Sequence, residues 1–167
     1  MDDKNVCGNV KIREFRPGDA SYISYLHMRL YQELYGFHGI FEYYVMKGLV
    51  EFLHNPDGGQ MWVAEIDGEI VASIAIVKAD DSSAQLRWFL VTEQCQGKGI
   101  GKKLVKIALD FCGERRYKKI LLWTANNLGS ARHLYESNGF VLVESKPNTE
   151  WTDELLYEEL WELNISV

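Results

Sequence analysis

The chain has 167 residues, of which 47% are hydrophobic and 25% are charged, and this length and composition fit one globular domain that buries a full core. The formal net charge of −6 argues against a protein that binds nucleic acid through a broad surface, because such surfaces are basic. Cys7, Cys95 and Cys112 have neither the number nor the spacing of a disulfide framework or a zinc site, so we expect no metal.

The first half of the chain is predicted to hold a strand, two helices and three antiparallel strands. Residues Val10–Phe15 form the first strand, and Asp19 after it is expected to cap the next helix. A second helix is predicted from about Phe41, because apolar residues recur there at helical spacing. The Asp-Gly pair at 67–68 is a strong hairpin signal between two β-rich runs, and Ala84–Val91 continues the sheet.

The second half alternates helices and strands after a glycine-rich loop, which an amphipathic helix follows. Residues Lys118–Thr124 are a continuous apolar run, which predicts a strand buried on both faces and central in its sheet. A short helix is expected over Ser130–Ser137, because Asn138-Gly139 is a helix-stopping pair, and a further strand follows it. The tail Asp153–Leu163 fits a helix by composition and a strand by its period-two pattern, so its residues alone leave both open.

Three glycines, Gly97, Gly99 and Gly101, lie in that loop. They do not match the dinucleotide fingerprint G-x-G-x-x-G, since Lys102 stands in place of the third glycine. A Walker A loop needs four residues between its two glycines, whereas three residues separate Gly97 from Gly101. The spacing therefore excludes both of these nucleotide-binding motifs.

What remains is a glycine loop that opens a helix, with Lys98, Lys102 and Lys103 beside it. Glycines let a backbone approach a ligand, and the first amides of a helix, together with its dipole, favour an anion. The loop is thus predicted to bind a phosphate or a pyrophosphate. An equally weighted alternative is that the glycines only form a tight turn for close packing of strand and helix.

Two motifs resemble those of one enzyme superfamily. The segment Gln96–Gly101, Q-x-x-G-x-G after a strand and at the start of a helix, resembles the acetyl-CoA pyrophosphate motif of the GNAT superfamily of N-acetyltransferases. Ala131–Phe140 resembles its second motif, A-x-x-L-Y-x-x-x-G-F, in the expected order and separation. More narrowly, segments such as RPGD and LLWT resemble the acetyltransferase domain found after winged-helix regulators in longer proteins.

The resemblance implies an α/β (α+β) fold for residues 1–167, a single GNAT-type domain. Its mixed, mostly antiparallel sheet would have about six to seven strands flanked by about four helices, with the tail Asp153–Leu163 as the last strand. The implied enzyme moves acetyl from acetyl-CoA to a primary amine of a small molecule or peptide by direct attack. Many members pair through their final strands, which leaves a homodimer open.

The resemblance also implies which residues bind acetyl-CoA. Backbone groups at Leu90, Val91 and Thr92, where the strand before the loop ends, would pair with the pantetheine arm. The pyrophosphate and the adenosine end would lie on the loop, at Gln96, Gly97, Lys98, Gly99, Ile100, Gly101 and Lys102. Members commonly carry an asparagine seven residues before the motif tyrosine, where this chain has Leu128. If the loop bulges by one residue, Asn127 takes that role.

For the chemistry, Tyr135 matches the family tyrosine near the thioester sulfur and is expected to act as general acid, because its phenol can protonate a departing thiolate. The alternative for Tyr135 is a core aromatic. Gln85 stands where members often carry a glutamate base, and glutamine cannot take a proton. Glu42 and Glu33, on the helical region over the acceptor side, are the candidate bases, unless the amine arrives neutral through ordered water.

The segment between Tyr35 and Glu42 is expected to read the substrate. The residues assigned to that role are Glu33, Tyr35, Phe37 and His38, whereas surface or capping roles are expected for His27, His54 and His133. Two function classes remain. The presence of Tyr135 favours an enzyme. The replacement of the usual glutamate by Gln85 is compatible with a non-catalytic acyl-CoA-binding sensor or interaction module. A donor longer than acetyl is a third alternative.

The expected compartment is the cytoplasm. The start of the chain has no apolar h-region, and no apolar run approaches 18 residues, so we expect neither a secretion signal nor a membrane span. The odd number of cysteines is likewise typical of a reducing environment.

Overall fold

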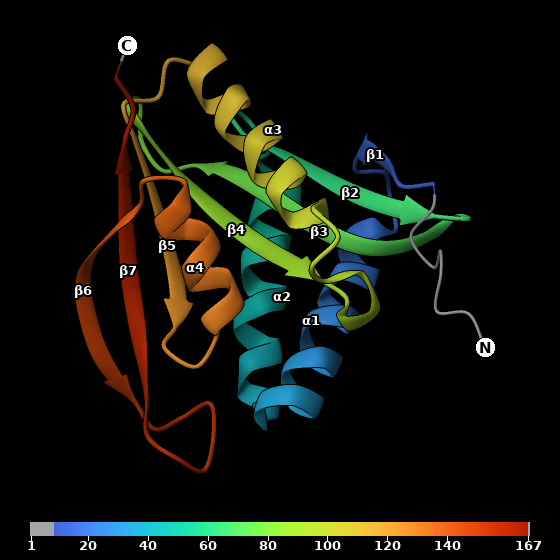
Figure 1. Ribbon diagram of the computed structural model, residues 1–167, viewed down its shortest axis with the longest axis vertical. Coiled ribbons are helices and arrows are strands. Elements are labelled where there is room, and N and C mark those ends of the chain that lie inside the picture. Colours follow the sequence, from blue (N-terminus) through green and yellow to red (C-terminus); the bar gives the residue numbers. More distant parts are fainter. Residues whose placement is uncertain (1–8, 167) are drawn as a thin grey trace.

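The computed structural model describes residues 9–166, so Cys7 lies outside the described residues. Seven strands form one mixed sheet, and four α-helices flank it (Figure 1). The elements are β1 Lys11–Glu14, α1 Asp19–Tyr35, α2 Gly39–His54, β2 Gln60–Ile66, β3 Glu69–Lys78, β4 Ser83–Val91, a 3-10 turn Glu93–Cys95, α3 Ile100–Glu114, β5 Lys119–Ala125, α4 Gly129–Ser137, β6 Val141–Asn148 and β7 Leu156–Asn164. The predicted fold class is confirmed.

The helices form a layer on each face of the sheet. Figure 1 shows α3 and α4 in front of the strands and α1 and α2 behind them. Leu104 of α3 and Tyr135 of α4 belong to the core between the front helices and the sheet, whereas Ile23 of α1 and Leu49 of α2 belong to the core behind it. Side chains of a strand alternate between the faces, so β2, β3 and β4 contribute to both cores, whereas β5 contributes Ile120 and Leu122 to the front core.

The strand order is β1-β2-β3-β4-β5-β7-β6, and among the strands of residues 9–166 only β4 and β5 are parallel neighbours. Their pairing is short and joins Ser83–Gln85 to Lys119–Leu121. Beyond it the register of β4 on β3 shifts between Ser73 and Ala75, and Trp88 there has a φ of 47°. Such a bulge bends a strand. The bulged end of β4 therefore separates from β5.

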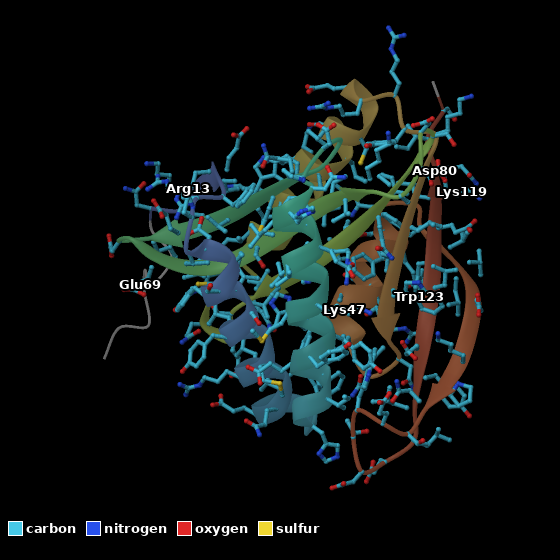
Figure 2. The ribbon with its side chains drawn as sticks, turned by 180° about the vertical axis from the view of Figure 1, so that it is seen from behind. Arg13, Lys47, Glu69, Asp80, Lys119 and Trp123 are labelled. Carbon is cyan, nitrogen blue, oxygen red and sulfur yellow. The ribbon has the colours of Figure 1, made fainter. Side chains whose placement is uncertain are left out.

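Helices α1 and α2 cover the part of the rear face that β2, β3 and β4 form. Figure 2, seen from behind, shows β5, β7 and β6 beside these helices, with Trp123 to the side of α2. The Trp123 side chain is 39% exposed. The prediction that this strand is buried on both faces was wrong, because the helices leave one of its faces open, although its central position is confirmed.

Two further predictions on local structure differ from the fold. Asp19 is the first residue of α1 and does not cap it, since Gly18 occupies the N-cap position. The Asp19 carboxylate instead accepts the Arg16 backbone N–H and pairs with Arg13 of β1, each at 2.7 Å. The second helix begins at Gly39 rather than near Phe41. The tail is a strand, β7, as the family resemblance implied.

Candidate functional site

The glycine loop presents unpaired amides at the start of α3. Gly97 and Gly99 have φ values of 73° and 81°, and Gly99 is the N-cap residue. The first intrahelical bond runs from Lys103 N–H to the Gly99 carbonyl at 3.1 Å. The N–H groups of residues 100–102 therefore precede the helical hydrogen-bond ladder, as they do at any helix start. A helix start with free amides of this kind is suited to an anion.

The three positions require glycine for different physical reasons. A Cβ atom at Gly97 or Gly99 would meet nothing within 4 Å, so these two serve the left-handed turn and leave the space beside the loop open. A Cβ at Gly101 would lie 3.0 Å from Phe89 Cζ and 3.4 Å from Val91 Cγ2. Gly101 thus lets α3 pack closely on β4. The tight-packing interpretation thus applies to Gly101, whereas the open space at Gly97 and Gly99 is compatible with the predicted phosphate site.

The end of β4 turns backbone groups toward the space between β4 and β5. Thr92 N–H donates to the Val71 carbonyl of β3 at 2.8 Å, so the Thr92 amide is already engaged. Since hydrogen-bonding groups alternate sides along a strand, the N–H and C=O of Val91 point away from β3. The Gln96 side chain donates to that carbonyl at 3.1 Å, which leaves Val91 N–H directed into the gap.

A cavity of about 540 Å³ lies between the α1/α2 layer and the sheet, and it reaches α4 where β4 and β5 separate. This volume is within the range of small-molecule sites. Residues from both helical layers line it: His27, Tyr31, Phe37, Phe41, Tyr44, Val45, Gln85, Leu86, Arg87, Trp88, Phe89, Trp123, Thr124, Ala125, Leu128, Ala131, Tyr135, Lys146, Asn148, Glu150, Trp151 and Glu158.

Tyr135 lies where the cavity passes through the sheet. Its side chain is 5% exposed and packs between Phe89 and Phe140, with ring centroids 6.1 and 5.9 Å away. Burial, and secondarily the nearby Tyr31 hydroxyl, raises the pKa of Tyr135 well above its ordinary value. The phenol therefore keeps its proton at neutral pH, which is the state a general acid requires.

Aromatic rings form the wall of the cavity at the α1–α2 junction. Phe37 is 2% exposed and lies 4.8 Å from Phe41 and 5.8 Å from Trp151, centroid to centroid. Of the predicted substrate contacts, Phe37 lines the cavity. Tyr35 packs against Tyr31 at 5.8 Å from outside it. His38 instead precedes α2 and pairs with Asp153, Nε2 to Oδ1 at 3.1 Å.

The carboxylates predicted as bases lie outside the cavity. Glu33 is on the exposed side of α1, where it pairs with Arg29 at 2.9 Å, and Glu42 is exposed in the first turn of α2. Neither lines the cavity, because both belong to the solvent side of their helices. Asn127 is also exposed and outside it, whereas Leu128 lines it. The geometry therefore gives Glu33, Glu42 and Asn127 no contact with the cavity.

A residue that sequence reasoning missed is His27, which is 3% exposed and lines the cavity. Its Nδ1 is 2.8 Å from the Ile23 carbonyl, so it carries the hydrogen, and its Nε2 has no hydrogen-bond partner among residues 9–166. Burial lowers the pKa of His27 to about 4. The expectation of a surface role was wrong. Its spacing of four from Ile23, on the apolar stripe of α1, could have indicated burial.

Other charged groups from late in the chain also line the cavity. Glu158 of β7 accepts a hydrogen bond from the Asn148 amide at 3.2 Å and faces Lys146 Nζ at 4.0 Å. The Tyr44 hydroxyl donates to Glu150, 3.3 Å from Oε2. Arg87 of β4, from earlier in the chain, is the fourth charged residue of the lining. No signal in the sequence brings these residues together, because β6 and β7 reach the site only through the sheet order.

Among residues 9–166 no group of three or more His, Cys, Asp or Glu side chains is arranged to hold a metal ion. In the same part of the chain no helix has both the length and the apolar character that crossing a bilayer requires.

Comparisons with known proteins agree with this geometry. The model of the "Acetyltransferase (GNAT) family" matches residues 21–140. N-acetylaspartate synthetase of Danio rerio is 32% identical over 96 residues, which cover 57% of this chain and 34% of that protein. The chain thus spans about a third of that relative's length.

Two solved structures share the fold. A GNAT-family acetyltransferase from Staphylococcus aureus Mu50 superposes with a TM-score of 0.77 at 20% identity, covering 95% of this chain and all of that one (100%). The acetyltransferase yncA of Salmonella typhimurium, solved with its cofactor acetyl-CoA, has a TM-score of 0.74 at 15% identity and covers 94% of both chains. Because the family model matches more than half of the sequence, the chain belongs to the acetyltransferase (GNAT) family, whose cofactor is acetyl-CoA.

Proposed function

We propose that the chain is an N-acetyltransferase that moves acetyl from acetyl-CoA to the primary amine of a small molecule or peptide. The observation that carries this proposal is the course of the cavity. It joins the aromatic pocket under α1 and α2 to the α4 side through the opening between β4 and β5, with Tyr135 at the junction. A donor on one side of the sheet and an acceptor on the other can meet only through such an opening.

The glycine loop fits the donor's diphosphate. The amides of Ile100, Gly101 and Lys102 and the open space beside Gly97 would hold it, and Lys98 and Lys102, both exposed, would face the phosphates of the adenosine end. Val91 N–H would pair with the pantetheine arm. Leu90 and Thr92 were also predicted to contact that arm, but the Thr92 amide donates to β3 and the alternation along the strand turns the backbone groups of Leu90 to the same side. When bound, acetyl-CoA supplies the acetyl group as a thioester.

Tyr135 supplies the proton that the departing sulfur needs. Its raised pKa keeps the hydroxyl protonated, and its position between Phe89 and Phe140 holds it beside the opening. The protonated hydroxyl would donate a hydrogen bond to the sulfur as the thioester bond breaks, which stabilises the developing thiolate and gives the proton a place of origin.

A carboxylate is also needed to receive the amine. Gln85 lines the cavity but cannot take a proton. Glu158 lines it as well, on the strand next to β5, and is held by Asn148. We assign Glu158 the role of binding the ammonium group and accepting its proton, in place of the exposed Glu42 and Glu33. The name of the relative N-acetylaspartate synthetase describes an enzyme that makes an N-acetylated amino acid, and a zwitterionic acceptor suits a cavity with charges of both signs.

The second candidate, a non-catalytic acyl-CoA-binding module, is favoured by Gln85 at the position where many members have a base. Thiol release from acetyl-CoA distinguishes the two. Wild-type protein is mixed with acetyl-CoA and a panel of amino acids, polyamines, aminoglycosides and Lys peptides, and Tyr135→Phe is run beside it. Release that depends on one acceptor class and is lost in the variant supports the enzyme. Binding of acetyl-CoA without any release contradicts it.

A further inference from the structure

Arg87 lies on the wall of the cavity formed by β4, just before the bulge at Trp88. Its guanidinium carbon is 4.6 Å from the centroid of the Trp88 ring. Above it α2 carries Gly48, and a Cβ atom there would lie 2.5 Å from Arg87 Nη2. A glycine in the middle of a helix weakens that helix. Its place in α2 is explained by the room that the guanidinium needs.

Apart from its contact with the Trp88 ring, this guanidinium has no hydrogen bond and no ion pair within the described part of the chain. Among residues 9–166, no carboxylate lies within 4.0 Å of Arg87 and no hydrogen bond engages it. Arg13, by contrast, pairs with both Asp19 and Glu65. Burial lowers the pKa of Arg87, and the charge of Glu51, exposed on α2, opposes this shift. A partly buried cation without a counter-ion is costly, and such arrangements are found at binding sites.

The other charges of the cavity are already engaged. Lys146 faces Glu158 and lies over the Trp123 ring, with Nζ 4.6 Å from its centroid. Glu150 receives the Tyr44 hydroxyl. Arg87 therefore remains the cation of the cavity that can form a new ion pair without breaking one. It projects from β4 toward Gly48 of α2, and β5 separates its strand from β7, which carries Glu158.

We propose that Arg87 binds a carboxylate of the acceptor, so that the preferred acceptors are amines that also carry a carboxylate, such as amino acids. This inference rests on the proposed acetyltransferase function and narrows its substrate class. The acceptor carboxylate would take the place that a counter-ion normally has beside a buried arginine, in a two-bond geometry that guanidinium favours. Glu158, at the other side, would take the amine.

The first test uses wild-type protein and matched acceptors. Each amino acid is compared with its carboxamide and with its decarboxylated amine, and kcat/KM is measured by thiol release. Loss of a partner from a buried charged pair costs at least about 30-fold, so the carboxamide and the amine should react at least about 30-fold more slowly than the acid. Equal rates within each matched set would overturn the proposal.

The second test uses variants at Arg87. Arg87→Met keeps much of the aliphatic stem over Trp88 and removes the charge, so it should abolish the preference for acids over carboxamides. Arg87→Lys should retain part of it. Lys47→Gln is the matched control, because Lys47 is an exposed cation on α2 that does not line the cavity (Figure 2). An unchanged preference in a folded Arg87→Met protein would contradict the assignment.

A binding measurement separates failure of this inference from failure of the proposed function. An N-acetylated amino acid and its carboxamide are titrated calorimetrically into protein saturated with coenzyme A. Tighter binding of the acid that Arg87→Met removes supports the carboxylate site, even if no amine in the panel reacts. Equal affinities for acid and carboxamide would overturn the carboxylate site, whatever the turnover.

Discussion

Replacing Gly48 by alanine should stabilise the fold and impair acceptor binding at the same time. Alanine in a helix interior is favoured over glycine by about 1 kcal/mol. The added Cβ would lie 2.5 Å from Arg87 Nη2 and 2.9 Å from its Cζ, but both atoms are at the far end of a flexible side chain that can rotate away. The free energy of unfolding should therefore lie between no change and a gain of about 1 kcal/mol.

The displaced guanidinium could no longer meet an acceptor carboxylate, so kcat/KM for amino acids should fall about 10-fold or more, while the affinity for acetyl-CoA stays unchanged. Urea unfolding measures the first effect and thiol release the second. Gly39→Ala is the matched control, since Gly39 is in the same helix and a Cβ there would meet nothing within 4 Å. A stability loss above about 2 kcal/mol, the size of a core packing defect, would mean that Arg87 is a rigid packing element and refute the reasoning.

Three other outcomes are expected. Tyr135→Phe should lower kcat about 100-fold or more, with acetyl-CoA affinity retained because the ring still packs on its neighbours; a fall in affinity with unchanged kcat would count against an acid role. Gly97→Ala should weaken acetyl-CoA binding measured by calorimetry, because φ is 73° there and alanine in that conformation costs about 1 kcal/mol or more. His27→Gln should flatten the acid side of the stability profile. Because burial lowers the pKa of His27 from 6.5 to about 4, the unfolded chain binds the proton first, and stability decreases as pH falls through this window by up to about 1.4 kcal/mol per pH unit. If the free energy of unfolding in urea depends on pH equally in wild type and variant, His27 is not the cause of the loss of stability in acid.

Much of the fold could be predicted from local patterns. Apolar periodicity and the Asp-Gly turn indicated the helices and the antiparallel meander, because these depend on neighbours in sequence. The tail is different. Its helix-favouring composition is overridden by pairing with β5 along Lys119–Ala125, a contact between distant segments. The open face at Trp123 could not be predicted either, since an apolar run does not say where α1 and α2 end over the sheet.

The residues of the candidate site likewise fall into those that the sequence could predict and those that it could not. The glycine loop and Tyr135 could be found because each lies in a short continuous motif. Glu158 and Arg87 could not, because β7 reaches the cavity only by inserting beside β5, and the bulge at Trp88 opens the strands. Choosing Glu42 and Glu33 because their helices cover the acceptor side did not find residues of the cavity, since the position of a helix does not fix which of its side chains face inward. The burial of His27, by contrast, could have been predicted, because it lies four residues after Ile23 and therefore on the same buried face of α1.

The central claim is that this chain consumes acetyl-CoA with an amine as acceptor. The most direct measurement is the rate of thiol release from acetyl-CoA with amino acids as acceptors, in wild type and in Tyr135→Phe, combined with mass spectrometry of the product. We predict an N-acetylated amino acid and a rate that the variant loses. Acetyl-CoA bound by the glycine loop, but released intact in the presence of every amine tested, would contradict the account.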